Sequence, residues 1–149
     1  MKLSDLFSKW EMVRKQMVDA VRPLSQGQLD WLPEGGKNTV GDLLRHIAEV
    51  ENWWFGMVVS GHTRLIEVNG ENAPGMDSIF EALEKSHRLV TDILSEESTE
   101  TWETKTYTME EIETLTLRQI VWHVAEHEMR HRGQIFMMMR LQGIAPPNV

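Results

Sequence analysis

The chain has no cysteine among its 149 residues. This absence excludes a disulfide framework, a thiolate nucleophile within the chain and a zinc site built from cysteines, so any metal ligands must be histidine or carboxylate. Positive charge is also scarce, because 15 Lys and Arg residues are outnumbered by 23 Asp and Glu residues, which leaves a formal net charge of −8. A protein that binds a nucleic-acid backbone needs a basic face, so the composition argues against a nucleic-acid partner.

Long apolar runs are missing as well. Charged residues interrupt the apolar ones from Met1 to Trp10, unlike in a signal peptide, and no apolar run approaches the ~20 residues that span a bilayer. The sequence therefore predicts a cytoplasmic protein without a membrane partner. Its length fits a single domain, residues 1–149, which is large enough to bury a core without disulfides.

Apolar residues recur at helical spacing in four segments, which predicts an all-α four-helix bundle. The segments are 3–22, 39–59, 77–96 and 116–142. Thr39 with Asp42, and Thr116 with Gln119, have the spacing of capping boxes, and Gly61 and Gly143 follow the ends of the second and fourth segments. Long polar loops connect the helices, and we expect the connector 97–115 to be extended, with room for a short strand pair. On the second helix the expected inner stripe is Leu43, His46, Val50, Trp53 and Met57.

The last segment carries three histidines, His123, His127 and His131, one every four residues. On a helix that turns about 100° per residue, each step of four drifts only about 40°, so the three project from one face. That face is otherwise mostly apolar, with Ile120, Val124, Gln134, Ile135, Met138 and Leu141. Histidines left unpaired there would be unfavourable. They are either core residues bonded to neighbours or metal ligands, and we favour ligands, because imidazoles roughly 6 Å apart along the axis can converge on one ion.

The run from His127 to His131 also matches the HExxH pattern of zinc proteases. In those enzymes the Glu is the general base and a third ligand follows downstream. Here residues 132–149 contain no His, Asp or Glu, and Glu128 points about 100° away from His127. The protease interpretation is therefore poor, and a third ligand must lie upstream.

Three upstream histidines, His46, His62 and His87, are candidates for that ligand. His62 follows Gly61 in a loop, where a solvated side chain is expected. His87 is flanked by Ser86 and Arg88, which indicates the edge of a buried stripe. We favour His46, which lies among apolar residues of the second helix.

Two motifs together carry a resemblance to a known family. The run from His123 to Ile135 ends in His131-Arg-Gly-Gln-Ile, and Leu43-Leu-Arg-His46-Ile-Ala lies upstream, followed by Glu51 and the pair Trp53-Trp54. In order and spacing these motifs resemble the DinB/YfiT-like family over nearly the whole chain. The resemblance implies a bundle of up-down-down-up topology, often dimeric, that binds a divalent metal such as nickel or zinc. Its implied ligands are His46, His127 and His131, which leaves His123 as a pocket residue.

The resemblance specifies the site residues more closely than it specifies the reaction. Similar proteins include thiol S-transferases that use bacillithiol or mycothiol, a mycothiol-dependent maleylpyruvate isomerase and metal-dependent hydrolases. We expect a small-molecule substrate and a three-histidine metal site, at which a low-molecular-weight thiol such as bacillithiol attacks an electrophile. A hydrolase, a metal-binding stress protein without turnover and an interaction module with structural histidines are the alternatives. Gln134 would orient an imidazole or a ligand, and Trp53 and Met138 would line the pocket. Glu49 and Glu128 are candidate general bases, but we favour solvated carboxylates at the helix edge for both.

A second apolar stripe lies on the other side of the last helix. It consists of Trp122, Ala125, Met129, Gly133 and Phe136. A helix that is apolar on two sides must be covered on both, either by the connector 97–115 or by a second subunit. We favour a homodimer.

Overall fold

The computed structural model describes residues 3–109 and 111–148 and is mostly helical. Four long segments correspond to the four predicted helices: α1 (Leu3–Val21), α3 (Val40–Glu51) continued by the π-helix η1 (Asn52–Val59), α4 (Met76–Glu96) and α6 (Leu117–Leu141). The connectors contain the short helices α2 (Gln26–Leu29) and α5 (Thr99–Thr104) and the antiparallel strands β1 (Thr106–Met109) and β2 (Glu113–Thr116). No helix in the described part of the chain is long and apolar enough to cross a membrane.

Capping residues explain where the helices begin. Thr39 accepts a hydrogen bond from the backbone N–H of Asp42, whose carboxylate accepts one from the N–H of Thr39. Thr116 and Gln119 form the second predicted box. Ser25 caps α2 and Ser98 caps α5, two helices that were not predicted from the sequence. Both are too short for an apolar period to be recognised.

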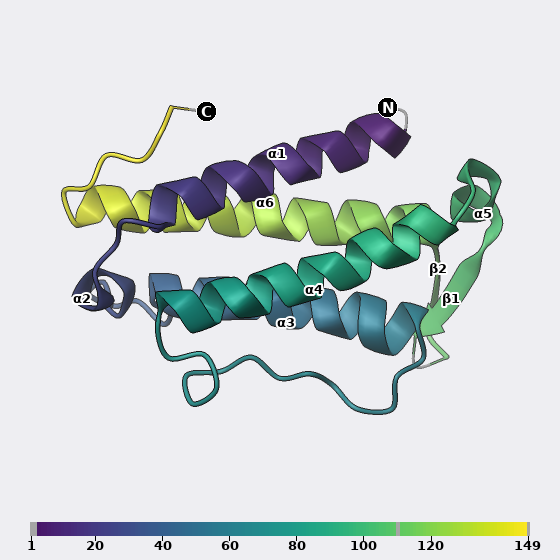
Figure 1. Cartoon of the computed structure of the whole chain (residues 1–149), viewed down its shortest axis with the longest axis horizontal. Coiled ribbons are helices and arrows are strands. Elements are labelled where there is room, and N and C mark those ends of the chain that lie inside the picture. The colour runs from purple at the N-terminus through teal and green to yellow at the C-terminus, as the bar shows by residue number, and fades with distance from the viewer. Residues whose placement is uncertain (1–2, 110, 149) are drawn as a thin grey trace.

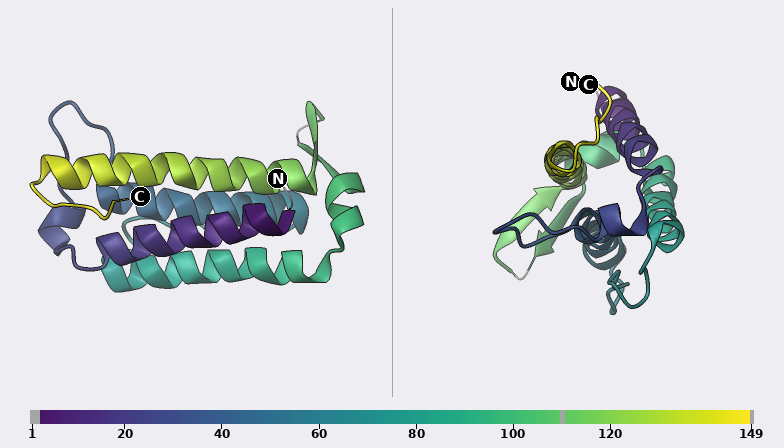
Figure 2. Two further views of the ribbon diagram at one scale, coloured as in Figure 1. Left: turned by 90° about the horizontal axis from the view of Figure 1, so that it is seen from above. Right: turned by 90° about the vertical axis from the view of Figure 1, so that its left-hand side faces the viewer.

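The long helices lie side by side in one bundle (Figures 1 and 2). Helix α6 packs on α1 and on α3, and α3 packs on α4. The loop after η1 returns along the length of the bundle before α4 begins, so α3 and α4 run in the same direction (Figure 1). The connector before α3 and the β1–β2 hairpin extend from the same side of the bundle at its opposite ends (Figure 2).

The core consists of two apolar clusters with a polar layer between them. One cluster includes Met17, Leu44, Ala48, Leu83 and Ile135, and the other includes Trp10, Phe55, Val90, Leu117 and Ala125. Along each long helix a buried polar residue lies between the members of the two clusters: Arg14 on α1, Glu51 on α3, Ser86 on α4 and Glu128 on α6. The bundle therefore encloses charge at mid-height.

The structure corrects two predicted helix faces. His46 is exposed, because α4 and α6 contact α3 from two sides and centre its buried sector on Leu44, Ile47 and Glu51. On α6, Ala125 and Phe136 of the second stripe are buried within the chain, where α1 packs, and of this stripe Trp122 remains 50% exposed. The second stripe is therefore not one continuous free surface.

Candidate metal centre

Three histidines from the packed helices α3 and α6 converge on one another. His46 is in the second turn of α3, and His127 and His131 lie about one turn apart on α6. The Nε2 atom of His127 is 3.0 Å from Nε2 of His46 and 2.9 Å from Nε2 of His131. Ligand atoms of all three lie within 4.8 Å of one another, and the group is able to hold a metal ion.

The donor set fits a divalent transition metal. Bonds of about 2.0–2.1 Å from a metal to imidazole nitrogens place neighbouring ligands about 3 Å apart, which is the spacing of Nε2 of His127 from Nε2 of His46 and of His131. Hydrogen bonds alone satisfy the cluster poorly, because each neutral ring has one N–H and one lone pair. The Nε2 atom of His127 would have to serve two partners at once, whereas a shared cation accepts all the lone pairs.

Gln134 determines which nitrogen of His131 carries the proton. Its Oε1 atom lies 2.6 Å from Nδ1 of His131, and a carboxamide oxygen can only accept. Nδ1 of His131 therefore donates, and Nε2 keeps its lone pair directed at the other two rings. This contact is consistent with the orienting role expected for Gln134, which remains a prediction.

Burial and proximity keep the cluster neutral. Burial, followed by the nearby His131 and His46, lowers the pKa of His127 to about 4. Burial and His131 also lower the pKa of His46. Since imidazole binds a metal only when it is neutral, the fold prepares these rings for ligation at neutral pH.

The expected pocket residues lie on both sides of the cluster. Towards the N-terminus of α6, the ring of His123 packs against Trp54, with centroids 5.0 Å apart, and Trp54 packs edge-on against Trp53. His123 is outside the three-histidine group. Towards the C-terminus, Gln134 and the buried Met138 line a common groove.

The other upstream histidines are separate from the cluster. His62 is exposed in the loop after η1. His87 is half-buried, and its ring nitrogens contact the carboxylates of Glu51 and Glu11. Glu49 accepts a hydrogen bond from the backbone N–H of Val68.

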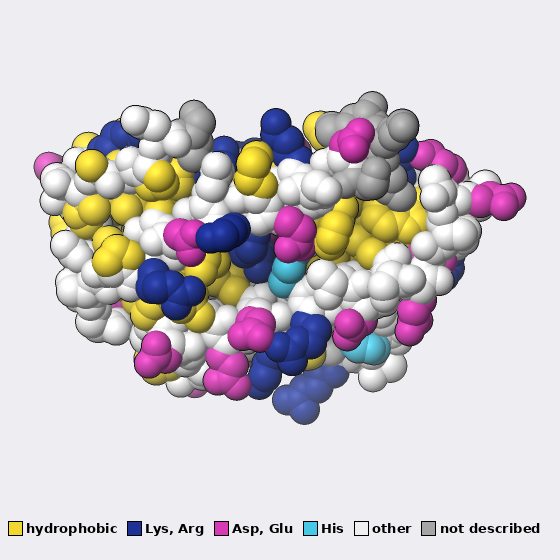
Figure 3. Space-filling view, turned by 45° about the horizontal axis from the view of Figure 1, so that its top comes forward, with side chains coloured by type: hydrophobic (Ala, Val, Ile, Leu, Met, Phe, Trp, Pro, Cys, Tyr) yellow, Lys and Arg dark blue, Asp and Glu magenta, His cyan; other side chains and the backbone are white. Residues whose placement is uncertain are grey.

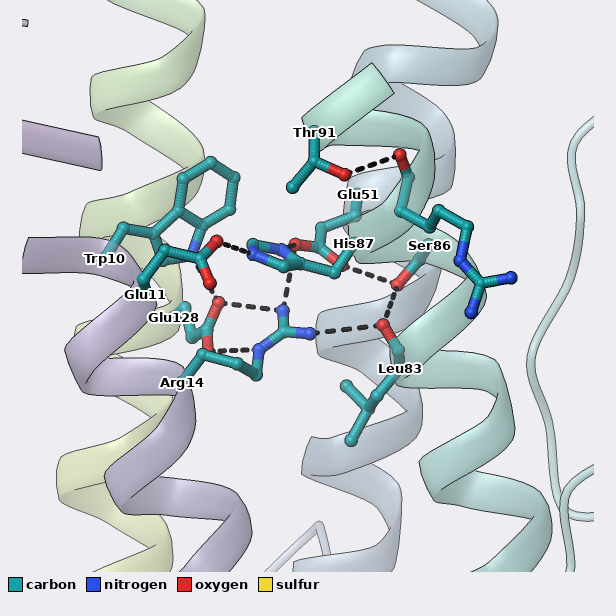
Figure 4. Close-up of polar contacts among 10 residues, drawn as sticks. Trp10, Glu11, Arg14, Glu51, Leu83, Ser86, His87, Thr91 and Glu128 are labelled. Atoms are coloured by element: carbon teal, nitrogen blue, oxygen red, sulfur yellow. Dashed lines mark hydrogen bonds and ion pairs between the residues drawn. The ribbon is translucent and has the colours of Figure 1, made fainter. Parts of the chain in front are cut away.

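The polar layer around His87 is a network that was not predicted from the sequence (Figure 4). Arg14 donates to Glu128 and to the Leu83 carbonyl, and also pairs with Glu51 at 2.9 Å. Trp10 donates its indole N–H to Glu128. The expectation that Glu128 is solvated is wrong, because it is 1% exposed. Glu128 follows Val121, Val124 and Ala125 at helical spacing, and this spacing was the sequence feature that could have indicated its burial.

Charges in this network stabilise one another. Burial disfavours the Arg14 cation, but Glu51 and Glu128 outweigh this effect and raise its pKa. Burial likewise disfavours the Glu51 carboxylate, yet Arg14 and His87 hold its pKa below the ordinary value. For His87, burial favours the neutral ring, but the bonds to Glu51 and Glu11 raise its pKa.

Comparison with solved structures agrees with the helical fold. A structure described as a DinB-like protein from Bacillus cereus ATCC 10987 superposes with a TM-score of 0.76 at 19% identity, covering 100% of this chain and 99% of that one. A structure described as TT2238, a four-helix bundle protein, superposes with a TM-score of 0.67 at 15% identity, covering 94% of this chain and 98% of that one. At these identities the likeness shows the fold alone.

No match is found among curated proteins. The sequence profile of the DinB family, however, matches residues 1–149. With a match of this extent, the chain belongs to the DinB family.

Proposed function

We propose that this chain is a metal-dependent enzyme of the thiol S-transferase type, with nickel or zinc held by His46, His127 and His131. The observation that carries the proposal is the approach of the three Nε2 atoms, two of them at 3.0 and 2.9 Å from the third. A divalent ion held there would act as a Lewis acid that lowers the pKa of a thiol or a water molecule at its remaining positions. We also propose that the four long helices follow the up-down-down-up order that the resemblance to the family implies.

The chain's own residues prepare the site. The lowered pKa of His127 and of His46 keeps both rings neutral, and Gln134 holds the proton of His131 on Nδ1. His46 is exposed, so small molecules can reach the cluster from solvent. These features favour a site with open positions over a closed structural site.

The thiol must come from another molecule, because the chain has no cysteine. We propose a low-molecular-weight thiol such as bacillithiol, in line with the family. Its sulfur would form a bond to an electrophilic carbon while the S–H proton passes to solvent, and the leaving group would depart with the bonding electron pair.

The test combines metal analysis with an activity screen. We expect about one divalent ion per chain, and conversion of monochlorobimane by the nickel- or zinc-loaded protein in the presence of bacillithiol. His46→Ala should lose both the ion and the activity, whereas His62→Ala, which changes an exposed histidine outside the group, should retain both. Hydrolysis of p-nitrophenyl acetate without thiol turnover would replace the proposal by a hydrolase, and bound metal without either activity by a metal-binding protein.

We further propose that the chain forms a homodimer whose contact includes Trp122. This tryptophan is 50% exposed near the start of α6. Tryptophans are enriched in the centres of protein interfaces, because each buries a large apolar area while only two side-chain torsions are fixed.

A further inference from the structure

A groove lies next to the three-histidine group. It lies between α6 and the residues around the start of α3, has a volume of about 560 Å³ and includes Gln134, which orients His131. Leu43, Met137 and Met138 provide its apolar surface, and Lys37 and Arg130 also line it. The volume is in the range of ~300–1,000 Å³ that small-molecule sites occupy. A groove of 480 Å³ between α1 and α4, on the face drawn in Figure 3, contains none of the three clustered histidines.

Gly133 lines this groove and contributes open space to it. It lies within α6, where glycine is less favourable than alanine because it loses more backbone freedom. The backbone does not demand glycine here, because Gly133 is not among the residues with positive φ. Packing does not demand it either, since among the described residues no atom beyond its chain neighbours and the nearby backbone of α6 lies within 4 Å of an added Cβ. The empty space beside Gly133 is therefore available to a molecule outside the chain.

The groove is also basic in an acidic protein. Among the residues that the structure describes, its lining contains Lys37 and Arg130 but no Asp or Glu, although the chain has a formal net charge of −8. Three other grooves each include at least one carboxylate in their lining: Glu84, Glu113, or Glu67 with Glu81.

The two cations of the groove are not equally available. Arg130 is paired with Glu126 at 2.7 Å, which compensates part of its charge. Lys37 has no carboxylate partner among the residues that the structure describes. Lys37 is therefore the principal free charge for a ligand.

We propose that this groove binds a small-molecule substrate that has an apolar body and an anionic group, with Lys37 as the main charge partner. The apolar body would lie on Met137 and Met138 in the space beside Gly133, and the bound molecule would extend past Gln134 towards His131. The inference rests on the proposed function for the chemistry at the metal centre, but binding in the groove requires no metal.

The test follows binding directly, with hexanoate as the probe and hexanol as its uncharged match. In protein carrying 13C-methyl methionine, hexanoate should shift the Met137 and Met138 signals saturably, in both metal-free and zinc-loaded protein. Hexanol should bind more weakly. Lys37→Gln should reduce hexanoate affinity about 2- to 5-fold, the range of an exposed ion pair, and leave hexanol unaffected. Lys15→Gln, an exposed lysine on α1, is the matched control and should change neither.

Gly133→Leu should fill the space and abolish the shifts, and Gly133→Ala, which any helix tolerates, should weaken them. Unchanged hexanoate binding in both variants would overturn the proposal. So would a change of oligomeric state in these variants, because the groove would then be a subunit contact. His131→Ala separates the two proposals: it should lose zinc but retain the methionine shifts. Loss of those shifts would show that the hexanoate carboxylate binds the histidines and not Lys37. If the unaltered protein showed the shifts but bound no zinc, only the proposed function would be refuted.

Discussion

His131 shows how a single neighbour can orient a candidate metal ligand. Gln134 accepts from Nδ1 at 2.6 Å, so the lone pair of Nε2 points at His127. Replacing Gln134 by Leu removes the acceptor and allows the other tautomer, in which Nε2 carries the proton. Loss of such an orienting partner typically weakens metal binding about 10- to 100-fold.

We therefore expect Gln134→Leu to weaken zinc binding by about that factor, while His123→Ala, outside the group, has a smaller effect. His127→Ala and His131→Ala should each remove most of the affinity. Competitive titration with a chromophoric chelator measures all four variants. If His123→Ala abolished binding while His131→Ala did not, the ligand pair on α6 would be His123 and His127, and the assignment would be wrong.

His87 makes stability depend on pH. Its folded-state pKa is raised above 6.5, since the carboxylates of Glu51 and Glu11 hold its proton although burial opposes it. The folded state thus binds this proton more tightly than the unfolded state does. The stabilisation is fully present below pH 6.5 and is lost as the pH rises through the raised pKa.

Comparison with His87→Gln isolates this effect, because glutamine keeps a donor but carries no charge. In metal-free protein the variant should lose more unfolding free energy relative to wild type at pH 6 than at pH 9, the sign that follows from the raised pKa. Urea denaturation at the two pH values measures the difference. Arg14, Glu51 and Glu11 remain in both proteins, and an equal loss at both pH values would show that the proton is not held.

At the scale of elements, the sequence predicted what local rules determine. The two Thr capping boxes locate the starts of α3 and α6, and the step of four between histidines places His127 and His131 together. The α5 helix and η1 place Trp102, Trp54 and Phe55 in one buried cluster, and apolar periodicity does not report such long-range contacts. Likewise, the exposure of His46 depends on which helices flank α3.

The polar layer was not predictable for a related reason. A charged residue within an apolar stripe ordinarily lies at the edge of the buried face, where its charged end reaches solvent. Here Arg14, Glu51 and Glu128 come from three helices and satisfy one another, which only their assembly reveals. Each alone would be unfavourable in the core.

Arg14 consequently ties α1 to α3, α4 and α6. Arg14→Ala leaves Glu128 buried without its cation and Glu51 with His87 alone, so we expect a loss of about 3–5 kcal/mol in unfolding free energy. Lys15→Ala, which breaks the exposed pair with Asp19, should lose less than about 1 kcal/mol. Urea denaturation measures both. Similar losses in the two variants would show that the Arg14 network adds nothing beyond a surface pair.

For the molecule as a whole, the three-histidine group lies outside the apolar core. The apolar clusters and the Arg14 network lie inside the bundle, whereas His46 is exposed at its surface. The helices therefore do not need the metal to bury their apolar faces, unlike those of a zinc finger. A chelator should remove bound metal without loss of helical structure, as seen by far-ultraviolet circular dichroism.

Assembly is the remaining property at this scale, and Trp122 is the residue that tests it. At 50% exposure its indole leaves a large apolar area in solvent, which a second copy of the chain would bury. Trp122→Glu would replace that contact by a desolvated charge on both sides of a symmetric interface, so the dimer should dissociate at micromolar concentration. Met12→Glu, at a similarly exposed apolar residue on α1 (47%), should leave the mass unchanged. Sedimentation velocity distinguishes the two variants, and a monomeric wild-type protein at that concentration would refute the dimer, because Trp122 would then be an ordinary exposed side chain.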